Sequence, residues 1–274
     1  ANPSSIVTSR NGKFIAVLDA FAQRAAVVSA VDGAVTLHET ITSTPNAAAF
    51  FGSDLWIALR DRSSVVRITL DGTLTEVAVA RDPAFVTVTD DFVYVYSRAG
   101  GRLQEIDPAR AVVTRSVAAA TAGSDLEILP PKPGAAPGAT AYLCRPQDGT
   151  IATFDLTKME SKGTMNVTGA PIDLAFVPFG AQLPQDPGTP LIIDLRKDAL
   201  IVAHAAVRHP STIDRVFVTA AGVFTYDSVT GSVYRLEGRA PVKIASGQTT
   251  SSFVATDEAL FTWDAQSAKP RRQP

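Results

Sequence analysis

The sequence predicts an all-β protein, a single β-propeller domain over residues 1–274 with seven blades of four antiparallel strands. Three observations predict this fold. Short runs of apolar, β-branched and aromatic residues are bounded by Gly, Asp, Asn and Pro, and long helical periods are absent. The runs come in groups of four that repeat about every 40 residues, the step of a propeller blade. Asp-Gly or an equivalent pair recurs at the same place in successive groups.

The clearest repeat unit runs from Ala47 to Ala80. It reads AAAFFG, LWIALRD, VVRITLDG and TLTEVAVA with polar turns between the runs, so we expect four consecutive strands, A to D. The next unit, from Ala84 to Ala118, repeats the order with AFVTVTDD, FVYVYSR, LQEID and VVTRSVA. Two such units in tandem indicate a repeat protein.

Turn residues support this register. The pairs that fall where strand C should turn into strand D are Asp32-Gly33, Asp71-Gly72, Glu237-Gly238 and the variant Asp107-Pro108. The residues that fall just before a B strand are Asn11-Gly12, Gly52-Ser53, Asp90-Asp91, Gly222 and Asp257-Glu258. We therefore expect hairpin turns at these positions.

The B strands give the blade count. Seven runs fit this strand: KFIAVLD, DLWIALR, FVYVYSR, TAYLCR, PLIIDLR, GVFTYD and ALFTWD. Proline-rich insertions, 130–139 and 179–190, fall in the A-to-B connections of blades four and five. Blade five is degenerate, because Leu200 to Val207 reads as one C strand and its D strand is short or missing. The last blade is incomplete, and a six-bladed ring is the alternative.

Composition narrows the partners. The chain has 25 basic and 27 acidic residues, a formal charge of −2, so we expect no nucleic-acid partner. No apolar run is long enough for a transmembrane segment. The single Cys excludes an internal disulfide, and the first residue, Ala1 rather than Met, suits an exported protein. We therefore expect a periplasmic or extracellular location.

Charged residues end the aligned B strands and form the candidate ligand site. They are Arg60, Arg98, Arg145 and Arg196 on one arc, and Asp19, Asp227 and Asp264 on the other. Propellers bind on the face formed by the B-to-C loops and the blade-to-blade links, so these charges predict a mouth that holds a protein or a small anionic or zwitterionic ligand. The alternative is that they are solvated loop charges or pairs between neighbouring blades.

No catalytic or cofactor motif accompanies these charges, so we assign no catalytic residue, metal or cofactor. His38, His204 and His209 do not complete a zinc set, and Cys144 lies in an apolar strand, as a buried structural thiol does. Aromatic residues gather in the B strands, where we expect them to pack between blades, with sugar stacking as the alternative. They are Trp56, Tyr94, Tyr96, Tyr142, Phe224, Tyr226, Phe261 and Trp263.

The stretch from Ser53 to Val79, SDLWIALRDRSSVVRITLDGTLTEVAV, resembles the YVTN, NHL and virginiamycin B lyase-like propeller repeats. The resemblance implies architecture. The lyase family uses a His and acidic cluster that faces the channel, and we find no matching His in the equivalent strands. The YVTN motif is absent, with VYVYSR (Val93 to Arg98) as its nearest counterpart.

These features predict a non-catalytic scaffold that binds a ligand or a protein. Two alternatives remain open: an enzyme of the lyase or lactonase type that acts at the channel mouth, and a propeller subunit of a larger assembly.

Overall fold

The computed structural model describes residues 4–134, 138–167, 169–177, 179, 183, 185, 188–194, 199–202, 205–210, 212–219, 222–245, 253–255, 260–264 and 269–273. The chain divides into two compact units. The first is Ala1–Ala122 with Met159–Ser161, and the second is Gly123–Lys158 with Lys162–Pro274. The described residues form β-strands and contain no helix, as the all-β prediction requires.

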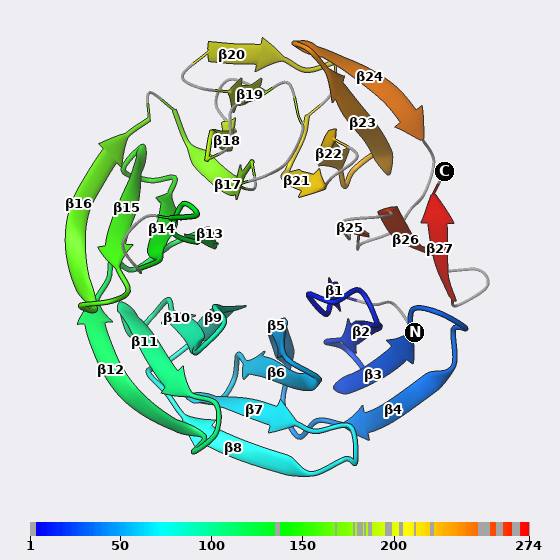
Figure 1. Ribbon diagram of the computed structural model, residues 1–274, viewed down its shortest axis with the longest axis vertical. Coiled ribbons are helices and arrows are strands. Elements are labelled where there is room, and N and C mark those ends of the chain that lie inside the picture. Colours follow the sequence, from blue (N-terminus) through cyan, green and yellow to red (C-terminus); the bar gives the residue numbers. More distant parts are fainter. Residues whose placement is uncertain are drawn as a thin grey trace. The chain divides into compact units, whose positions relative to one another are not determined.

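The first unit holds three sheets, each of four consecutive antiparallel strands that we denote A to D (Figure 1). Their strands are β1 (Ser5–Thr8), β2 (Phe14–Asp19), β3 (Arg24–Ser29) and β4 (Val35–Thr40); β5 (Pro45–Phe51), β6 (Asp54–Leu59), β7 (Ser64–Ile68) and β8 (Leu74–Ala78); and β9 (Pro83–Val88), β10 (Val93–Ser97), β11 (Arg102–Asp107) and β12 (Val112–Ala118). The A strands of neighbouring sheets contact one another, β1 with β5 and β5 with β9.

The second unit continues the pattern with three four-stranded sheets and a three-stranded one in its described part. Their strands are β13 (Asp125–Leu129), β14 (Thr140–Arg145), β15 (Thr150–Asp155) and β16 (Glu160–Asn166); β17 (Pro171–Phe176), β18 (Pro190–Asp194), β19 (Ala199–Val202) and β20 (Ala205–Arg208); β21 (Arg215–Thr219), β22 (Gly222–Asp227), β23 (Ser232–Glu237) and β24 (Ala240–Ala245); and β25 (Phe253–Ala255), β26 (Leu260–Asp264) and β27 (Lys269–Gln273).

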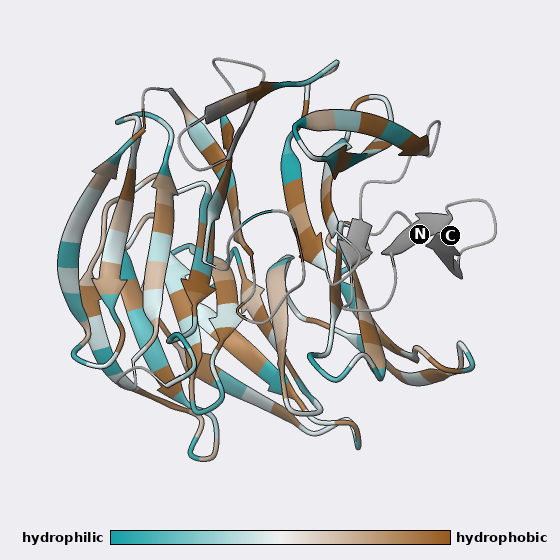
Figure 2. Cartoon of the chain, turned by 45° about the horizontal axis from the view of Figure 1, so that its top comes forward, coloured by the Kyte–Doolittle hydropathy of each residue, from teal (hydrophilic) through white to brown (hydrophobic). Residues whose placement is uncertain are grey.

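The B strands β6 and β18 are apolar on both faces because a neighbouring sheet covers each face. In β6, Leu55 and Ile57 pack toward the first sheet, and Trp56 and Ala58 pack toward the third. In β18, Leu191 and Ile193 pack into one hydrophobic cluster, and Ile192 between them packs into another. Figure 2 shows the hydrophobic residues in brown, mostly along the strands. The period-2 alternation of a strand is therefore hidden where both faces are buried.

The predicted C-to-D turns are confirmed. Asp32 Oδ1 accepts a hydrogen bond from the Ala34 amide at 3.1 Å, and Asp71 Oδ1 accepts one from the Thr73 amide at 3.1 Å. The following glycines have positive φ angles, +71° at Gly33 and +84° at Gly72, a conformation that glycine adopts without strain. Asp257-Glu258 lies outside the described residues.

The prediction for the fifth sheet was wrong in one respect. The run from Leu200 to Val207 is not one C strand but contains residues of both β19 and β20, which pair with each other from Val202↔Ala205 to Ala199↔Arg208. The D strand is thus present, although it has only four residues. A continuous apolar run carries no change of period that would mark a turn within it.

The last sheet was predicted to be incomplete, and it has three strands in the described part of the chain. Its third strand, β27, pairs with β26 from Leu260↔Gln273 to Asp264↔Lys269. The proline-rich segments lie where they were predicted, 130–139 between β13 and β14 and 179–190 between β17 and β18.

Candidate functional site

The B-to-C turns and the links between sheets meet at the same end of each sheet, which we call the B–C end. The amide of Arg60, which follows β6, donates to the carbonyl of Thr44 in the preceding link at 3.0 Å. The amide of Arg98 donates to the Asp82 carbonyl at 2.8 Å in the same way. Residues at the ends of B strands therefore lie beside the inter-sheet links.

The predicted site residues occupy two different register positions. Asp19, Arg145 and Asp227 are the last residues of their B strands, and each pairs with the first residue of the C strand. Arg60 and Arg98 lie one residue further on, because Leu59 and Ser97 hold the strand-end position. We aligned the B strands on their last charged residue, and this alignment placed residues of two different register positions in one column.

The side chains of two other members of the predicted site lie outside the described part of the structure. Arg196 lies outside the described residues. Asp264 ends β26, and its backbone alone is described. Asp194, which the sequence analysis did not select, holds the strand-end position of the fifth sheet.

The carboxylates of the strand-end aspartates accept hydrogen bonds from backbone amides, those of Asp19 and Asp227 within their own turns and that of Asp194 from the link before its sheet. Asp19 Oδ1 accepts from the Ala22 amide at 2.8 Å, and Asp227 Oδ1 accepts from the Val229 amide at 2.9 Å. Asp194 Oδ1 accepts from the Ala170 amide at 3.0 Å. All three aspartates are buried. These carboxylates cap backbone amides, which is a structural use of Asp in a turn.

Arg145 also has a local partner, since it forms an ion pair with Asp148 in the turn that follows its own strand. The guanidinium of Arg98 lies over the ring of Phe85, with 5.8 Å from Cζ to the ring centre. Among the predicted arginines, Arg60 is the exposed one that forms no ion pair with any described residue.

Arginines of the first unit differ in whether an acid pairs with them, and Arg62, in the turn between β6 and β7, pairs with Glu76. Those at or near the opposite end of the sheets are held by acids, as Arg67 is by Asp54, with Nε 2.7 Å from Oδ2, and Arg110 by Asp107, with Nε 2.6 Å from Oδ2. Four exposed arginines at the B–C end have no ion-pair partner in the described part of the chain: Arg24, Arg60, Arg81 and Arg102. We call these four residues the arginine face.

The backbone brings part of this face together at one corner of the third sheet. The Gly100 amide donates to the Arg81 carbonyl at 2.9 Å, so the link that carries Arg81 lies against the turn between Arg98 and Arg102. A Cβ at Gly100 would lie 2.7 Å from the Ala80 Cβ, closer than real side chains approach. Glycine at this position therefore permits the close approach.

Acids only partly offset the arginine face. Asp61 is exposed and Asp82 half-buried in the same turns and links, while Asp19 is turned to its own backbone. Arginine keeps its charge at all ordinary pH values and presents a planar set of donors that matches carboxylate and phosphate. The arginine face is thus a local positive surface on a chain with a net charge of −2.

A second charged group lies on the A strands of the second unit. Asp125, Asp173 and Arg215 share one register position on β13, β17 and β21, each opposite the residue before the end of the B strand. Asp125 Oδ2 accepts from the Leu174 amide at 3.0 Å, and Asp173 Oδ2 accepts from the Val216 amide at 2.6 Å. We call Asp125, Asp173 and Arg215 the A-strand row. Each carboxylate joins its strand to the next A strand.

Burial shifts the titration of these carboxyls. It raises the pKa of Asp125 to about 6, although the positive charge of Arg215 opposes the shift. Burial and the charge of Asp125 raise the pKa of Asp173 well above its usual value, and burial and both aspartates do the same for Glu127, two residues along β13. Burial therefore raises the pKa of both carboxyl groups of the row in the folded protein.

Charged residues within the predicted A strands point to the A-strand row, and the alignment of the B strands did not use them. SDLEIL, PIDLAF and IDRVFV each place a charge inside an apolar run at the start of a repeat. Charges inside such runs are rare in sheet cores unless they are paired or hydrogen-bonded. An alignment of IDLAFV with IDRVFV places Asp173 beside Asp214, so the membership of Arg215 in the row follows from the strand register alone.

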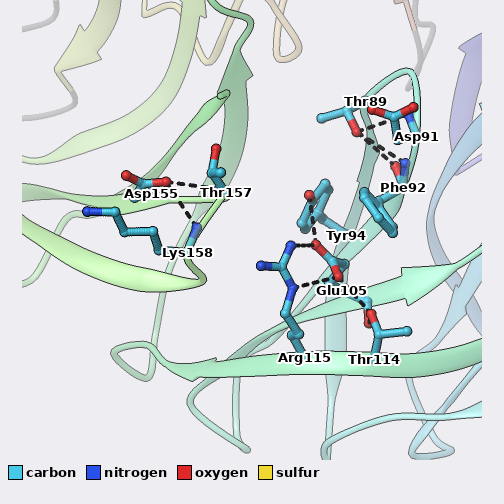
Figure 3. A network of polar contacts seen from close by, with 10 residues as sticks. All are labelled: Thr89, Asp91, Phe92, Tyr94, Glu105, Thr114, Arg115, Asp155, Thr157 and Lys158. Atoms are coloured by element: carbon cyan, nitrogen blue, oxygen red, sulfur yellow. Dashed lines mark hydrogen bonds and ion pairs between the residues drawn. The ribbon is translucent and has the colours of Figure 1, made fainter. Parts of the chain in front are cut away.

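A buried network in the third sheet is structural (Figure 3). Glu105, 1% exposed, accepts from the Tyr94 hydroxyl at 3.1 Å, from the Thr114 hydroxyl at 2.7 Å and from Arg115 Nε at 2.8 Å. Burial raises the pKa of Tyr94, and the donors from Arg115 and Thr114 hold the pKa of Glu105 down against its own burial. The carboxylate is fully used by strands β10 to β12.

The remaining candidates are also structural. Cys144 is buried, as predicted, and burial raises the pKa of its thiol, so it is a poor nucleophile. His38 is exposed, His209 Nε2 lies 2.8 Å from the Thr225 hydroxyl, and His204 lies outside the described residues. Trp56 and Tyr96 of the B strands are fully buried, which confirms packing between sheets for these two.

Two searches of the described residues found nothing. No group of three or more His, Cys, Asp or Glu there is placed to hold a metal ion. The same residues include no helix with the length and apolarity of a membrane span.

Comparison with solved structures shows a β-propeller fold. A selenomethionine-substituted virginiamycin B lyase from Staphylococcus aureus matches with a TM-score of 0.77 and 11% identity, over 99% of this chain and 94% of that chain. A Kuenenia stuttgartiensis hydrazine synthase chain matches with a TM-score of 0.72 and 14% identity, over 99% and 95%. A functionally unknown protein from Desulfotomaculum acetoxidans DSM 771 matches with a TM-score of 0.70 and 12% identity, over 94% of each chain.

At these identities the likeness concerns the fold. No protein-family model matches the chain, and no curated protein does.

Proposed function

We propose that this propeller is a binding module that holds an anionic partner on the arginine face. One observation carries the proposal: Arg24, Arg60, Arg81 and Arg102 are exposed at the B–C end with no ion pair to any described residue, whereas five other arginines of the first unit are paired with acids, Arg62 at the B–C end among them. Unpaired guanidinium groups on one surface attract carboxylate or phosphate and orient it through paired hydrogen bonds.

The contrast with the paired arginines explains why this end binds. An arginine already held by an acid loses that partner when it meets a ligand, so its net gain is small. An unpaired arginine exchanges water for the ligand. Several positive charges on one surface also raise the local concentration of an anion and speed its association. We therefore expect affinity to fall as ionic strength rises.

The test compares two double variants that remove the same charge. Arg60→Ala with Arg102→Ala changes the arginine face, and Arg10→Ala with Arg110→Ala changes two exposed arginines that are already paired with Asp90 and Asp107. Calorimetric titration with citrate and with oligoglutamate should show binding by wild type and by the second variant, and weakened binding by the first. Equal binding by the two variants would contradict the proposal.

We further propose seven blades, formed by all the sheets of one domain that spans residues 1–274. The repeated A-to-D strand order of the sheets supports this count, as does the coverage of nearly the whole chain by propellers of similar length. A crystal structure with six blades and a separate terminal sheet would contradict it.

A second candidate function is enzymatic, and the A-strand row favours it. A carboxyl with a pKa of about 6, as at Asp125, can donate and accept a proton near neutral pH. A related fold is that of a virginiamycin B lyase variant with bound quinupristin, so quinupristin is the probe. Liquid chromatography with mass spectrometry should show loss of intact quinupristin that Asp125→Asn reduces. Intact quinupristin after long incubation excludes this activity.

A further inference from the structure

Phe21 is a second unusual feature of the B–C end. Its side chain is 98% exposed, in the turn between β2 and β3. Arg24 of the arginine face begins β3, three residues further on. An aromatic ring and an unpaired guanidinium are therefore displayed by the same short turn.

The turn itself forces this exposure. Asp19 caps the turn by accepting the Ala22 amide, and Gln23 has a φ of +54°, so the chain reverses around Phe21. The residue two places after the strand end is exposed in every B-to-C turn whose side chains are described: Phe21, Asp61, Ala99, Gln147 and Val229. A side chain at this apex cannot reach the core of its own unit.

Solvent favours a small or polar residue at such an apex, as Asp61 and Ala99 are in the neighbouring sheets of the first unit. Phe21 instead offers a whole ring to solvent. Burial of one phenylalanine is worth roughly 1.5–3 kcal/mol, so the ring is a strong contact for an apolar group that arrives from outside. Aromatic and arginine side chains together are the residue types that dominate protein interfaces.

We infer that the arginine face takes an acidic polypeptide segment that carries an apolar side chain, with Phe21 as the apolar contact. This inference rests on the proposed function and names the class of its partner. Acidic side chains of the segment meet Arg24 and Arg60, and its apolar side chain covers the ring of Phe21. A small anion such as citrate uses the arginines alone.

The test uses two synthetic peptides, an oligoglutamate with one central leucine and the same peptide with serine in its place. We expect the leucine peptide to bind wild type more tightly. Phe21→Ala should weaken the leucine peptide by roughly tenfold or more, the effect of losing one buried ring, and leave the serine peptide unchanged. The control is Val229→Ala, since Val229 is 85% exposed at the same turn position with no arginine in its turn.

The outcomes separate the two proposals. If both peptides and citrate fail to bind wild type, the proposed function fails. If both peptides bind equally, or if Phe21→Ala and Val229→Ala have the same effect, the arginine face stands and the role of Phe21 is refuted. Both substitutions truncate side chains that are exposed, so neither is expected to prevent folding.

Discussion

Asp125→Asn should make the protein more stable at neutral and alkaline pH. Asparagine has the shape of aspartate, and its Oδ1 can still accept the hydrogen bond that the Leu174 amide donates to Asp125. The substitution removes the charge that burial opposes. It therefore separates the cost of ionising this carboxyl from the value of its hydrogen bond.

The magnitude follows from the pKa. Folding raises the pKa of Asp125 from 3.8 to about 6. One pKa unit corresponds to about 1.4 kcal/mol, so the ionised carboxyl costs about 3 kcal/mol of folding free energy. The sign is that of a carboxyl with a raised pKa. Wild type pays no penalty below pH 3.8, loses stability as the pH rises toward 6, and bears the full cost above it.

The assay is urea unfolding of wild type and variant between pH 4 and pH 8, followed by far-UV circular dichroism. The gain in unfolding free energy from Asp125→Asn should be about 2.5 kcal/mol larger at pH 8 than at pH 4, where the unfolded carboxyl is already partly ionised. The control is Asp32→Asn, because hydrogen bonds from Ser29 and Ala34 lower the pKa of exposed Asp32. The free energy of unfolding of Asp32→Asn at pH 8 should be slightly lower than that of wild type. A pH-independent gain for Asp125→Asn, or a loss at pH 8, would refute the reasoning.

Two further pairs of substitutions test the repeat geometry and the buried network. Gln23→Gly should raise the unfolding free energy by about 1 kcal/mol, because Gln23 has a φ of +54°, where glycine is unstrained. Gly231 has a φ of +64° in the equivalent turn, so Gly231→Gln should lower the unfolding free energy. Thermal unfolding measures both, and destabilisation by Gln23→Gly would contradict the argument. Glu105→Ala should lower the free energy of unfolding in urea by about 3 kcal/mol, because it removes the carboxylate that accepts hydrogen bonds from Arg115 and from two hydroxyl groups. Arg110→Ala, which breaks an exposed pair, should cost under about 1 kcal/mol. Equal costs for these two would contradict the role assigned to Glu105.

The fold was largely predictable because each level of the sequence agrees with it. Asp32-Gly33 and Asp71-Gly72 mark their turns through local chemistry, and the β6 run LWIALR marks a strand covered on both faces. The division between β19 and β20 was not predictable by the same means. Apolar residues predominate in both strands, so periodicity offers no boundary between them.

The candidate site was less predictable, because its meaning depends on pairing in space. Arg60 and Arg110 both lie in polar turns that follow a strand. The structure gives Arg110 an acid partner and leaves Arg60 without one among the described residues. Asp19 and Asp227 are predicted ligand residues, and in the structure each carboxylate accepts a backbone amide of its own turn. A charged residue at a strand end thus has two uses that sequence alone does not separate.

The central claim is that unpaired arginines at the B–C end bind an anionic partner. The salt dependence of oligoglutamate binding tests it most directly, since the number of charges engaged sets how steeply affinity falls with ionic strength. We predict a steep dependence for wild type and for Arg10→Ala with Arg110→Ala, and a shallower one with lower affinity for Arg60→Ala with Arg102→Ala. The same dependence in all three proteins would contradict the claim.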